Sequence, residues 1–342
     1  MAEQATPILE VAGLAKHYPV LRGIVFKRQI AAVRALDGVD FELRTGETLG
    51  IVGESGCGKS TLARLLLAIE RPTAGTVRYD GRDLFAMSRP ELKRARREIQ
   101  IVFQDPYASL DPRMTVADLV GEPFDIHPEV APRGDRRARV RELLELVGLD
   151  PAHLRRYPHQ FSGGQRQRIG IARALALRPS VLICDEPVSA LDVSVQAQVL
   201  NLLLTLRQEL HLSCLFISHD LSVVRHIADR LAVMYLGKIV ETGSEEEIYE
   251  RPTHPYTQAL LSAVPEPNPR LRGVRVGPPI VGEVPSPLRV PSGCRFRTRC
   301  WRAEDVCTTD EPALIIRDES PHASACHFAA PLRADHAKEP ST

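Results

Sequence analysis

The sequence predicts an α/β protein with a largely parallel β-sheet and helices on both of its faces. Short apolar runs alternate with helical patterns along the middle of the chain, which is the order that a parallel sheet requires. A glycine-rich loop separates one of these runs from the helix that follows it. Four cysteines then gather near the C-terminus, which indicates a small additional region.

The predicted strands are short, apolar and bounded by turn residues, as buried strands are. They cover Ala32–Leu43, Thr48–Val52, Thr76–Tyr79, Gln100–Phe103, Val181–Asp185, Cys214–Ser218 and Arg230–Tyr235. Helical patterns cover Lys59–Ile69, Arg137–Val147, Gly164–Leu177, Val195–Glu209 and Leu221–Ala228. The N-terminal strands have no helix between them, so we expect an antiparallel β flank there. The proline-containing stretch Asp105–Tyr157 predicts an inserted helical subdomain.

Charge and hydropathy argue against several functional classes. Lys and Arg number 44 against 43 Asp and Glu, so there is no basic excess to neutralise a nucleic acid. Residues 1–10 lack the pattern of a signal peptide. The longest apolar runs, such as Val199–Leu206, are shorter than the ~18 residues that a membrane span needs. We therefore expect a cytosolic chain without a nucleic-acid partner, which can dock on a membrane protein.

Composition also divides the chain into expected domains. The main domain is expected at 7–262, with the helical subdomain at approximately 105–160. Beyond Leu261 the segment Val264–Pro291 is crowded with Pro, Gly and Arg, as linkers and irregular segments are. We expect a C-terminal region with the four cysteines at 263–330 and a frayed polar tail at 331–342.

The glycine-rich loop fits the phosphate-binding pattern G-x-x-x-x-G-K-[ST]. Its residues are Gly53, Glu54, Ser55, Gly56, Cys57, Gly58, Lys59 and Ser60, with Thr61 next. The glycines allow backbone N–H groups to surround phosphates, and the start of the following helix adds its positive dipole end. Lys59 is expected to contact the β- and γ-phosphates, and the Ser60 hydroxyl to bind Mg²⁺.

Polar side chains follow three of the predicted strands. Asp185 and Glu186 end the run Val181–Asp185, and at the carboxyl end of a strand they can reach a phosphate crevice. Asp185 suits the Mg²⁺ shell, and Glu186 suits the base that activates or orients water. Gln104, which can contact Mg²⁺ or water, and His219, which can contact the γ-phosphate or water, follow two further strands.

A second glycine turn lies at Ser162-Gly163-Gly164-Gln165 and opens a predicted helix. Ser162 is a natural N-cap, and the two glycines expose the first N–H groups of the helix. Such a helix start can bind a second anion. An ordinary capped helix would show the same residues, so this turn alone decides nothing.

The order of these motifs resembles that of an ABC-type ATPase. The set comprises the phosphate loop (Walker A), Gln104 (Q-loop), Ser162–Gln165 (signature), Asp185–Glu186 (Walker B), Ser189–Asp192 (D-loop) and His219 (switch). Tyr18 is placed like the aromatic residue that stacks on adenine. Phe161 and Cys184 depart from the usual pattern without removing a phosphate contact. The resemblance implies a P-loop NTPase core of the ABC type that hydrolyses ATP with Mg²⁺.

Flanking blocks narrow the resemblance to the ATPase subunits of dipeptide and oligopeptide importers, and to the second (F-type) of the two. These blocks are Val33–Val39, Phe103–Tyr107, Arg156–Ser162 and His254–Thr257. The family implies a head-to-tail heterodimer with a paralogous ATPase subunit. Each ATP then lies between the Walker A loop of one chain and the signature of the other, and Asp192 belongs to the residues around the nucleotide. It also implies two integral permease subunits, an extracytoplasmic peptide-binding protein, and a peripheral place on the cytoplasmic face of the membrane.

The four C-terminal cysteines, Cys294, Cys300, Cys307 and Cys326, lack the close Cys pairs of most structural zinc sites. In a reducing cytosol they indicate a metal or redox site rather than disulfides. The resemblance favours a [4Fe–4S] cluster, because some importer ATPases with this tail hold one. Zinc, with His322 or His327 as a substitute ligand, and plain thiols remain alternatives.

Two functional alternatives accompany the expected peptide import. The same importer type can carry nickel, glutathione or an antimicrobial peptide. A non-transport ABC protein that acts on nucleic acid or ribosomes is the other alternative, although such proteins usually carry two cassettes or basic arms.

Overall fold

The computed structural model describes residues 7–22, 28–263, 278, 280–317 and 322–331, which fall into two compact units. The first unit contains the described residues of 1–9, 42–48 and 78–218. The second contains those of 10–41, 49–77 and 219–342. None of the helices in these ranges combines the length and the apolar character that a membrane crossing needs.

The first unit is built on three parallel strands in the order β8-β7-β6. They are β6 (Ile99–Val102), β7 (Val181–Asp185) and β8 (Ser213–Ser218). Every residue of β7 and β8 is buried, which explains why their sequences are continuous apolar runs rather than alternating ones. The helices around them are α2 (Arg89–Glu98), α6 (Gly163–Leu175) and α7 (Val193–Leu210).

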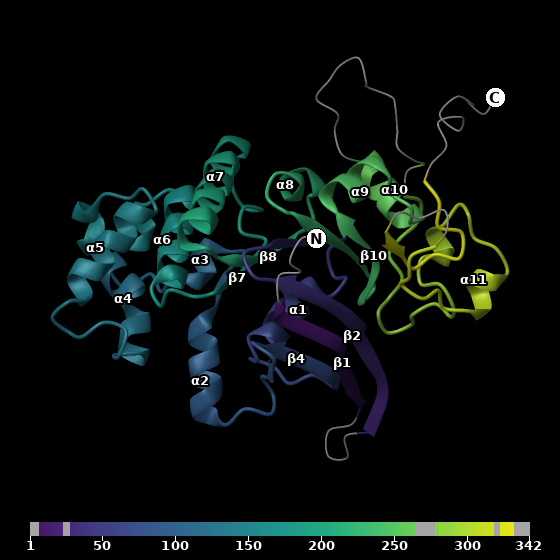
Figure 1. Ribbon diagram of the computed structural model, residues 1–342, viewed down its shortest axis with the longest axis horizontal. Helices are drawn as coiled ribbons and strands as arrows, with labels where there is room; N and C mark the ends of the chain where they lie inside the picture. Colours follow the sequence, from purple (N-terminus) through teal and green to yellow (C-terminus); the bar gives the residue numbers. More distant parts are fainter. Residues whose placement is uncertain (1–6, 23–27, 264–277, 279, 318–321, 332–342) are drawn as a thin grey trace, which may run out of the picture. The chain divides into compact units, whose positions relative to one another are not determined.

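Between β6 and α6 the chain forms helices alone. They are α3 (Pro106–Ser109), α4 (Val116–Ile126), α5 (Arg136–Leu146) and two 3-10 turns, Pro151–Arg155 and Pro158–Gln160. Helix α4 begins with a capping box, in which Thr115 and Asp118 satisfy each other's backbone N–H groups. Helices α4, α5 and α6 pack together (Figure 1).

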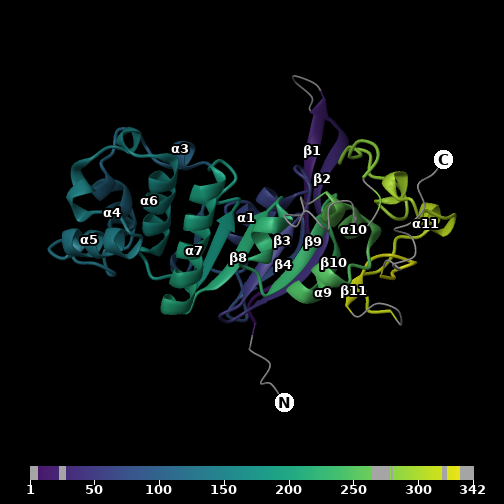
Figure 2. The same ribbon diagram turned by 90° about the horizontal axis from the view of Figure 1, so that it is seen from above.

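The second unit contains a strand group in the order β11-β10-β9-β3. Its members are β3 (Thr48–Val52), β9 (Arg230–Tyr235), β10 (Lys238–Ser244) and β11 (Ala323–Ser324). Strand β3 runs parallel to β9, whereas β9 and β10 form an antiparallel pair with an irregularity between Ile239 and Glu241. Helix α9 (Glu245–Glu250) packs on β9 and β10 (Figure 2).

A second strand group of this unit has the order β2-β1-β4 and contains two long N-terminal strands. Its members are β1 (Pro7–Arg22), β2 (Arg28–Arg44) and β4 (Ala74–Tyr79), and the short β5 (Arg82–Asp83) of the first unit follows β4 in the chain. The other helices of the second unit are α1 (Lys59–Leu66), α8 (Leu221–Arg225), α10 (Pro255–Ser262) and α11 (Val306–Thr309).

A buried carboxylate fastens the C-terminal segment to β10. Glu241 is fully buried and accepts hydrogen bonds from the Thr253 N–H at 2.6 Å and the Thr253 hydroxyl at 2.7 Å. The ring of His322 lies 2.7 Å from the same carboxylate. Although burial raises the pKa of Glu241, these hydrogen bonds hold it below its ordinary value.

The α/β prediction is confirmed, and β3, β7 and β9 have the predicted bounds. The predicted helices Lys59–Ile69 and Leu221–Ala228 were too long, since α1 ends at Leu66 and α8 at Arg225. Sequence reasoning did not identify β1, β10 or α2. Helix α2 is rich in charged residues, with Ala95 as its one buried residue, so its apolar periodicity is weak.

Candidate functional site: a phosphate loop and a carboxylate pair

The phosphate loop connects β3 to α1, as the sequence predicted. Gly58 is the N-cap of α1, with φ +115°, and no side chain caps this helix start. A Cβ atom at Gly58 would lie 2.3 Å from the Ala35 carbonyl oxygen, so a larger residue would need the backbone to shift. The loop therefore presents the uncapped start of a helix, which is the arrangement that favours anions.

Lys59 lies inside this loop and is 5 % exposed. Its ammonium group donates to the Gly53 carbonyl oxygen at 2.6 Å and to the Glu54 carbonyl oxygen at 3.1 Å. The Cys57 sulfur lies 3.9 Å away, and burial raises the pKa of that thiol despite the nearby Lys59 charge. Cys57 is therefore a neutral small side chain at neutral pH, and the cation of Lys59 is held at the loop by carbonyl oxygens.

Tyr18 belongs to the same unit as the phosphate loop. Its hydroxyl donates to Glu70 at 2.6 Å, and the Lys16 ammonium lies 5.0 Å from the centre of its ring. Burial and the hydrogen bond to Glu70 raise the pKa of Tyr18, so the phenol is neutral. The side chain is half-buried. The expected stacking on adenine stays a prediction.

In the first unit, the carboxylate pair lies at the end of β7. Asp185 is the last, buried residue of the strand, and Glu186 follows with φ +46°, a left-handed conformation that is uncommon for a residue with a side chain. The Glu186 N–H donates to the Ile217 carbonyl oxygen at 2.9 Å. The strand therefore ends at this residue, and Glu186 lies just beyond it.

Gln104 and Glu186 are 82 positions apart in the sequence, and the structure brings them together. The Gln104 amide donates to the Glu186 carboxylate at 3.0 Å. The parallel register, which pairs Val102 with Cys184, explains the contact, because both side chains follow the carboxyl ends of neighbouring strands. A carboxylate oriented by an amide suits a group that orients or deprotonates water.

The second glycine turn also lies in the first unit and begins α6 with a capping box. The Gln165 N–H donates to the Ser162 hydroxyl at 3.3 Å, and the Ser162 N–H donates to the Gln165 side chain at 3.1 Å. A Cβ atom at Gly164 would lie 2.3 Å from Val195 Cγ1, so close packing on α7 requires glycine here. Ser162 is exposed, and Gly163 is the first residue of the helix.

The remaining predicted residues lie near these groups in the chain. Asp192 is the exposed N-cap of α7, and the Ser189 hydroxyl donates to the Glu186 carbonyl oxygen at 3.1 Å. His219 is exposed and belongs to the second unit, directly before Asp220, which caps α8 by accepting from the Ser222 N–H at 2.8 Å. Of the predicted phosphate-site residues, the loop 53–61, Tyr18 and His219 thus lie in the second unit and the others in the first.

The four C-terminal cysteines lie near one another, because the other three thiols all contribute to the pKa of Cys326. Burial, with smaller contributions from the other thiols, raises the pKa of Cys300 to about 11 and that of Cys326 to about 12. The Cys294 N–H donates to the Cys307 carbonyl oxygen at 2.9 Å. Within the described ranges, however, no three His, Cys, Asp or Glu side chains are arranged to hold a metal ion.

The two histidines considered as substitute zinc ligands have other partners. His322 is hydrogen-bonded to Glu241, and His327 Nε2 lies 3.0 Å from the Asp310 carbonyl oxygen. All four thiols are free of disulfide bonds. The donor chemistry of four neighbouring thiols fits a metal cluster, but their present arrangement is not a closed ligand set.

Sequence reasoning missed the residues that support the phosphate loop from the C-terminal segment. Arg299 donates to the Glu54 carboxylate at 2.7 and 2.9 Å, and the Glu54 N–H donates to the Tyr256 hydroxyl at 2.9 Å. The available signal was Glu54 itself, because a carboxylate in a phosphate loop requires a counter-charge. Where in the chain that counter-charge would come from could not be read from the sequence.

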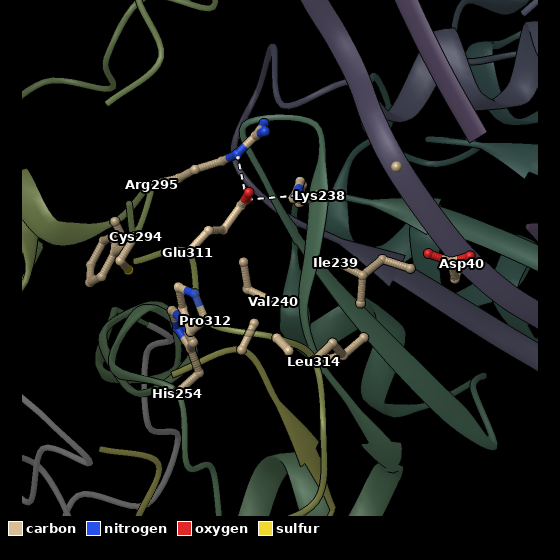
Figure 3. A pocket seen from close by; sticks show the side chains of 14 residues that line it. Asp40, Lys238, Ile239, Val240, His254, Cys294, Arg295, Glu311, Pro312 and Leu314 are labelled. Carbon is tan, nitrogen blue, oxygen red and sulfur yellow. Dashed lines mark hydrogen bonds and ion pairs between the residues drawn. The ribbon is translucent and has the colours of Figure 1, made fainter. Parts of the chain in front are cut away.

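Arg295 belongs to the same segment and extends the network. It donates to the Leu236 carbonyl oxygen at 2.5 Å, pairs with Asp37, and lies 3.4 Å from Glu311. Figure 3 shows Arg295 and Lys238 converging on Glu311. These side chains and Cys294 line a cavity of about 280 Å³. The cysteine segment is therefore joined to the rest of the second unit by ion pairs as well as by β11.

Two family models match this chain, one mainly in its N-terminal half and one in its C-terminal half. The ABC transporter family model matches residues 36–189, and the model described as "Oligopeptide/dipeptide transporter, C-terminal region" matches residues 240–307. The chain is 52% identical to the oligopeptide transport ATP-binding protein AppF of Bacillus subtilis, covering 96% of this chain and 98% of that protein. It is also 50% identical to the oligopeptide transport ATP-binding protein OppF of Salmonella typhimurium, covering 96% and 98%.

Solved structures agree with the sequence relatives. The dimeric post-hydrolysis state of the ATP-binding cassette MJ0796, bound to ADP and Pi, matches with a TM-score of 0.61 and 29% identity over 69% of this chain and 98% of that one. The cbiO1 protein of Clostridium perfringens, part of a cbiONQ ABC transporter complex, matches with the same TM-score and identity over 71% and 91%. The chain therefore belongs to the ABC transporter ATPases, among the ATP-binding subunits of the oligopeptide/dipeptide transporter family.

Proposed function

We propose that this ATPase powers the import of dipeptides or oligopeptides across the cytoplasmic membrane. The single observation that carries the catalytic part is the hydrogen bond of 3.0 Å from Gln104 to Glu186, directly after the buried Asp185. The peptide cargo is supported by the relatives named as oligopeptide and dipeptide transport ATP-binding proteins, which match nearly the whole chain.

In this proposal the phosphate loop binds the phosphates of ATP through the N–H groups at the start of α1 and through Lys59. The oxygen donors that would hold Mg²⁺ are Ser60, Gln104 and Asp185, and the ion would neutralise charge on the phosphates. Glu186 orients or deprotonates the attacking water, with its carboxylate held by Gln104. His219 would contact the γ-phosphate or the water, and Tyr18 would stack on adenine.

The signature turn Ser162–Gln165 and Asp192 would serve the ATP that is bound by a partner chain. This role requires a head-to-tail pair, for which we propose a paralogous ATPase subunit. Two integral permease subunits and an extracytoplasmic peptide-binding protein would complete the importer. The chain would then be peripheral on the cytoplasmic face of the membrane, and cargo would never touch it.

The substitution Glu186→Gln tests the catalytic assignment. It removes the ionisable carboxylate and keeps the size and the hydrogen-bonding partner, so ATP binding should persist while turnover in the assembled transporter falls by at least about a hundredfold. Binding of a fluorescent ATP analogue and release of phosphate measure the two properties separately. An undiminished rate of phosphate release would show that Glu186 is not the base.

Purification from detergent-solubilised membranes tests the assembly. Co-purification with two integral subunits and a second ATPase supports an importer, whereas recovery without any membrane partner favours a non-transport ABC protein. Nickel, glutathione and antimicrobial peptides are alternative cargoes of the same importer type. The ligand that the cognate binding protein retains would decide among them, because that protein selects the cargo.

For the C-terminal region, which we place at 263–330 after an ATPase domain at 7–262, we propose a [4Fe–4S] cluster held by Cys294, Cys300, Cys307 and Cys326. The support is the gathering of four thiols near one another, since Cys294, Cys300 and Cys307 all contribute to the pKa of Cys326. Iron, acid-labile sulfide and zinc should be measured in protein purified anaerobically. Four iron and four sulfide atoms per chain are expected, and zinc without iron would contradict the cluster.

A further inference from the structure

Glu54 is an acidic residue inside a loop that binds the polyanion ATP. Its backbone is well placed there, because the carbonyl oxygen accepts from Lys59 at 3.1 Å and the N–H donates to the Tyr256 hydroxyl at 2.9 Å. Its carboxylate, in contrast, adds a negative charge close to the phosphates. An uncompensated charge at this place would weaken ATP binding by direct repulsion.

Arg299 supplies the compensating charge from 245 positions further along the chain. Two of its nitrogens donate to the two carboxylate oxygens of Glu54, at 2.7 and 2.9 Å, in the forked geometry that an arginine offers to a carboxylate. The Arg299 side chain is 5 % exposed and the Glu54 side chain 25 %. Solvent therefore screens this pair less than it screens an ion pair on the open surface.

Aromatic packing fixes the position of Arg299 behind the loop. Phe296 is almost fully buried, with its ring 5.3 Å from that of Tyr235 and 5.4 Å from that of Tyr256. The guanidinium of Arg299 lies 5.8 Å from the Tyr235 ring. Because Tyr256 holds the Glu54 N–H, this aromatic cluster supports both the arginine and the loop that it contacts.

We propose that Arg299 is a positioning residue for nucleotide binding, which acts by neutralising Glu54 and holding it away from the phosphates. The C-terminal segment 294–300 thereby contributes a charge to the phosphate site of its own chain. This inference rests on the proposed binding of ATP by the phosphate loop. It assigns to the cysteine-containing segment a direct effect on ATP affinity.

Four variants of the full chain test the proposal, with a fluorescent ATP analogue titrated at low and at high salt. Arg299→Gln should weaken binding on the order of tenfold, because it leaves the Glu54 carboxylate unpaired. Glu54→Gln should strengthen binding, because the Arg299 cation remains. The double variant Arg299→Gln/Glu54→Gln should return to near the wild-type affinity. The loss in Arg299→Gln should shrink at high salt, as screening requires.

Arg297→Gln is the matched control, since Arg297 lies on the same turn but donates to Ser292 instead of the phosphate loop. Its affinity should equal that of the wild type. Weaker binding in Glu54→Gln, or a double variant no better than Arg299→Gln, would overturn the electrostatic role. The Glu54→Gln result decides the question even if Arg299→Gln fails to fold.

Lys59→Met separates this inference from the proposed function. If Lys59→Met binds the analogue as the wild type does, the loop is not the ATP site and the proposed function fails. If Lys59→Met loses binding while Arg299→Gln and Glu54→Gln match the wild type, the inference alone fails.

Discussion

Two glycine-containing turns of this chain each begin a helix, but the first N–H groups of the two helices have different surroundings. At the start of α1 no side chain caps the helix, and Lys59 is buried against the carbonyl oxygens of the loop. At the start of α6, Ser162 and Gln165 cap the helix reciprocally. The first turn is supported by the C-terminal segment, through Arg299 and Tyr256 on Glu54, whereas the second is capped by its own side chains and exposes Ser162.

This difference indicates a division of work between the turns. An uncapped helix start beside a buried cation has the chemistry that favours phosphates, which supports the proposed ATP site of this chain. A turn that is capped by its own side chains and exposes Ser162 can form without a ligand and still offer a polar group to a partner. The comparison thus supports the proposal that Ser162–Gln165 serves the ATP of another chain.

Removal of the cation at the first turn should have the largest effect. Lys59→Met keeps most of the side-chain volume and removes the charge, so the ATP affinity of the full chain should fall by about thirtyfold or more, the loss expected for a buried charge contact. Titration with a fluorescent ATP analogue measures this. An unchanged ATP affinity would contradict the idea that the first turn, unlike the second, binds the nucleotide of its own chain.

A methyl group at the second turn should act through packing. In Gly164→Ala the new Cβ would lie 2.3 Å from Val195 Cγ1, so we expect a loss of about 1–3 kcal/mol in the free energy of unfolding. Gly170→Ala in the same helix is the matched control, because its Cβ would meet nothing within 4 Å. Urea unfolding should show the control to be more stable than the wild type by about 0.5–1 kcal/mol. Equal effects of both variants would contradict the packing argument.

Loss of the cap should have the smallest effect on the isolated chain. Ser162→Ala removes the oxygen that accepts from the Gln165 N–H, which should cost about 0.5–2 kcal/mol in unfolding free energy. The ATP affinity of the chain's own phosphate loop should not change, whereas ATP turnover by the assembled pair should fall. A Ser162→Ala chain that loses affinity for ATP when alone would mean that the turn serves its own nucleotide.

The motifs were predictable because each depends on local geometry. A strand, a glycine loop and a helix in sequence specify the phosphate loop, and an apolar run that ends in Asp185 and Glu186 specifies a buried strand with carboxylates at its end. The contact between Gln104 and Glu186 follows from the parallel pairing of β6 with β7. It could not be predicted from the sequence, because the sequence does not give the register of the two strands. Helix α2 and strand β10 were missed because their sequences carry a weak periodic signal.

The sequence by itself determined the α/β class, the two helix starts and the order of the motifs, because backbone propensity and hydrophobic period act over a few residues. Only the tertiary structure decided which distant groups meet. The pairing of Arg299 with Glu54 and of His322 with Glu241 joins residues 245 and 81 positions apart. A carboxylate removed from water needs a partner, so burial makes such pairs necessary. The sequence around the carboxylate, however, does not indicate which distant residue that partner is.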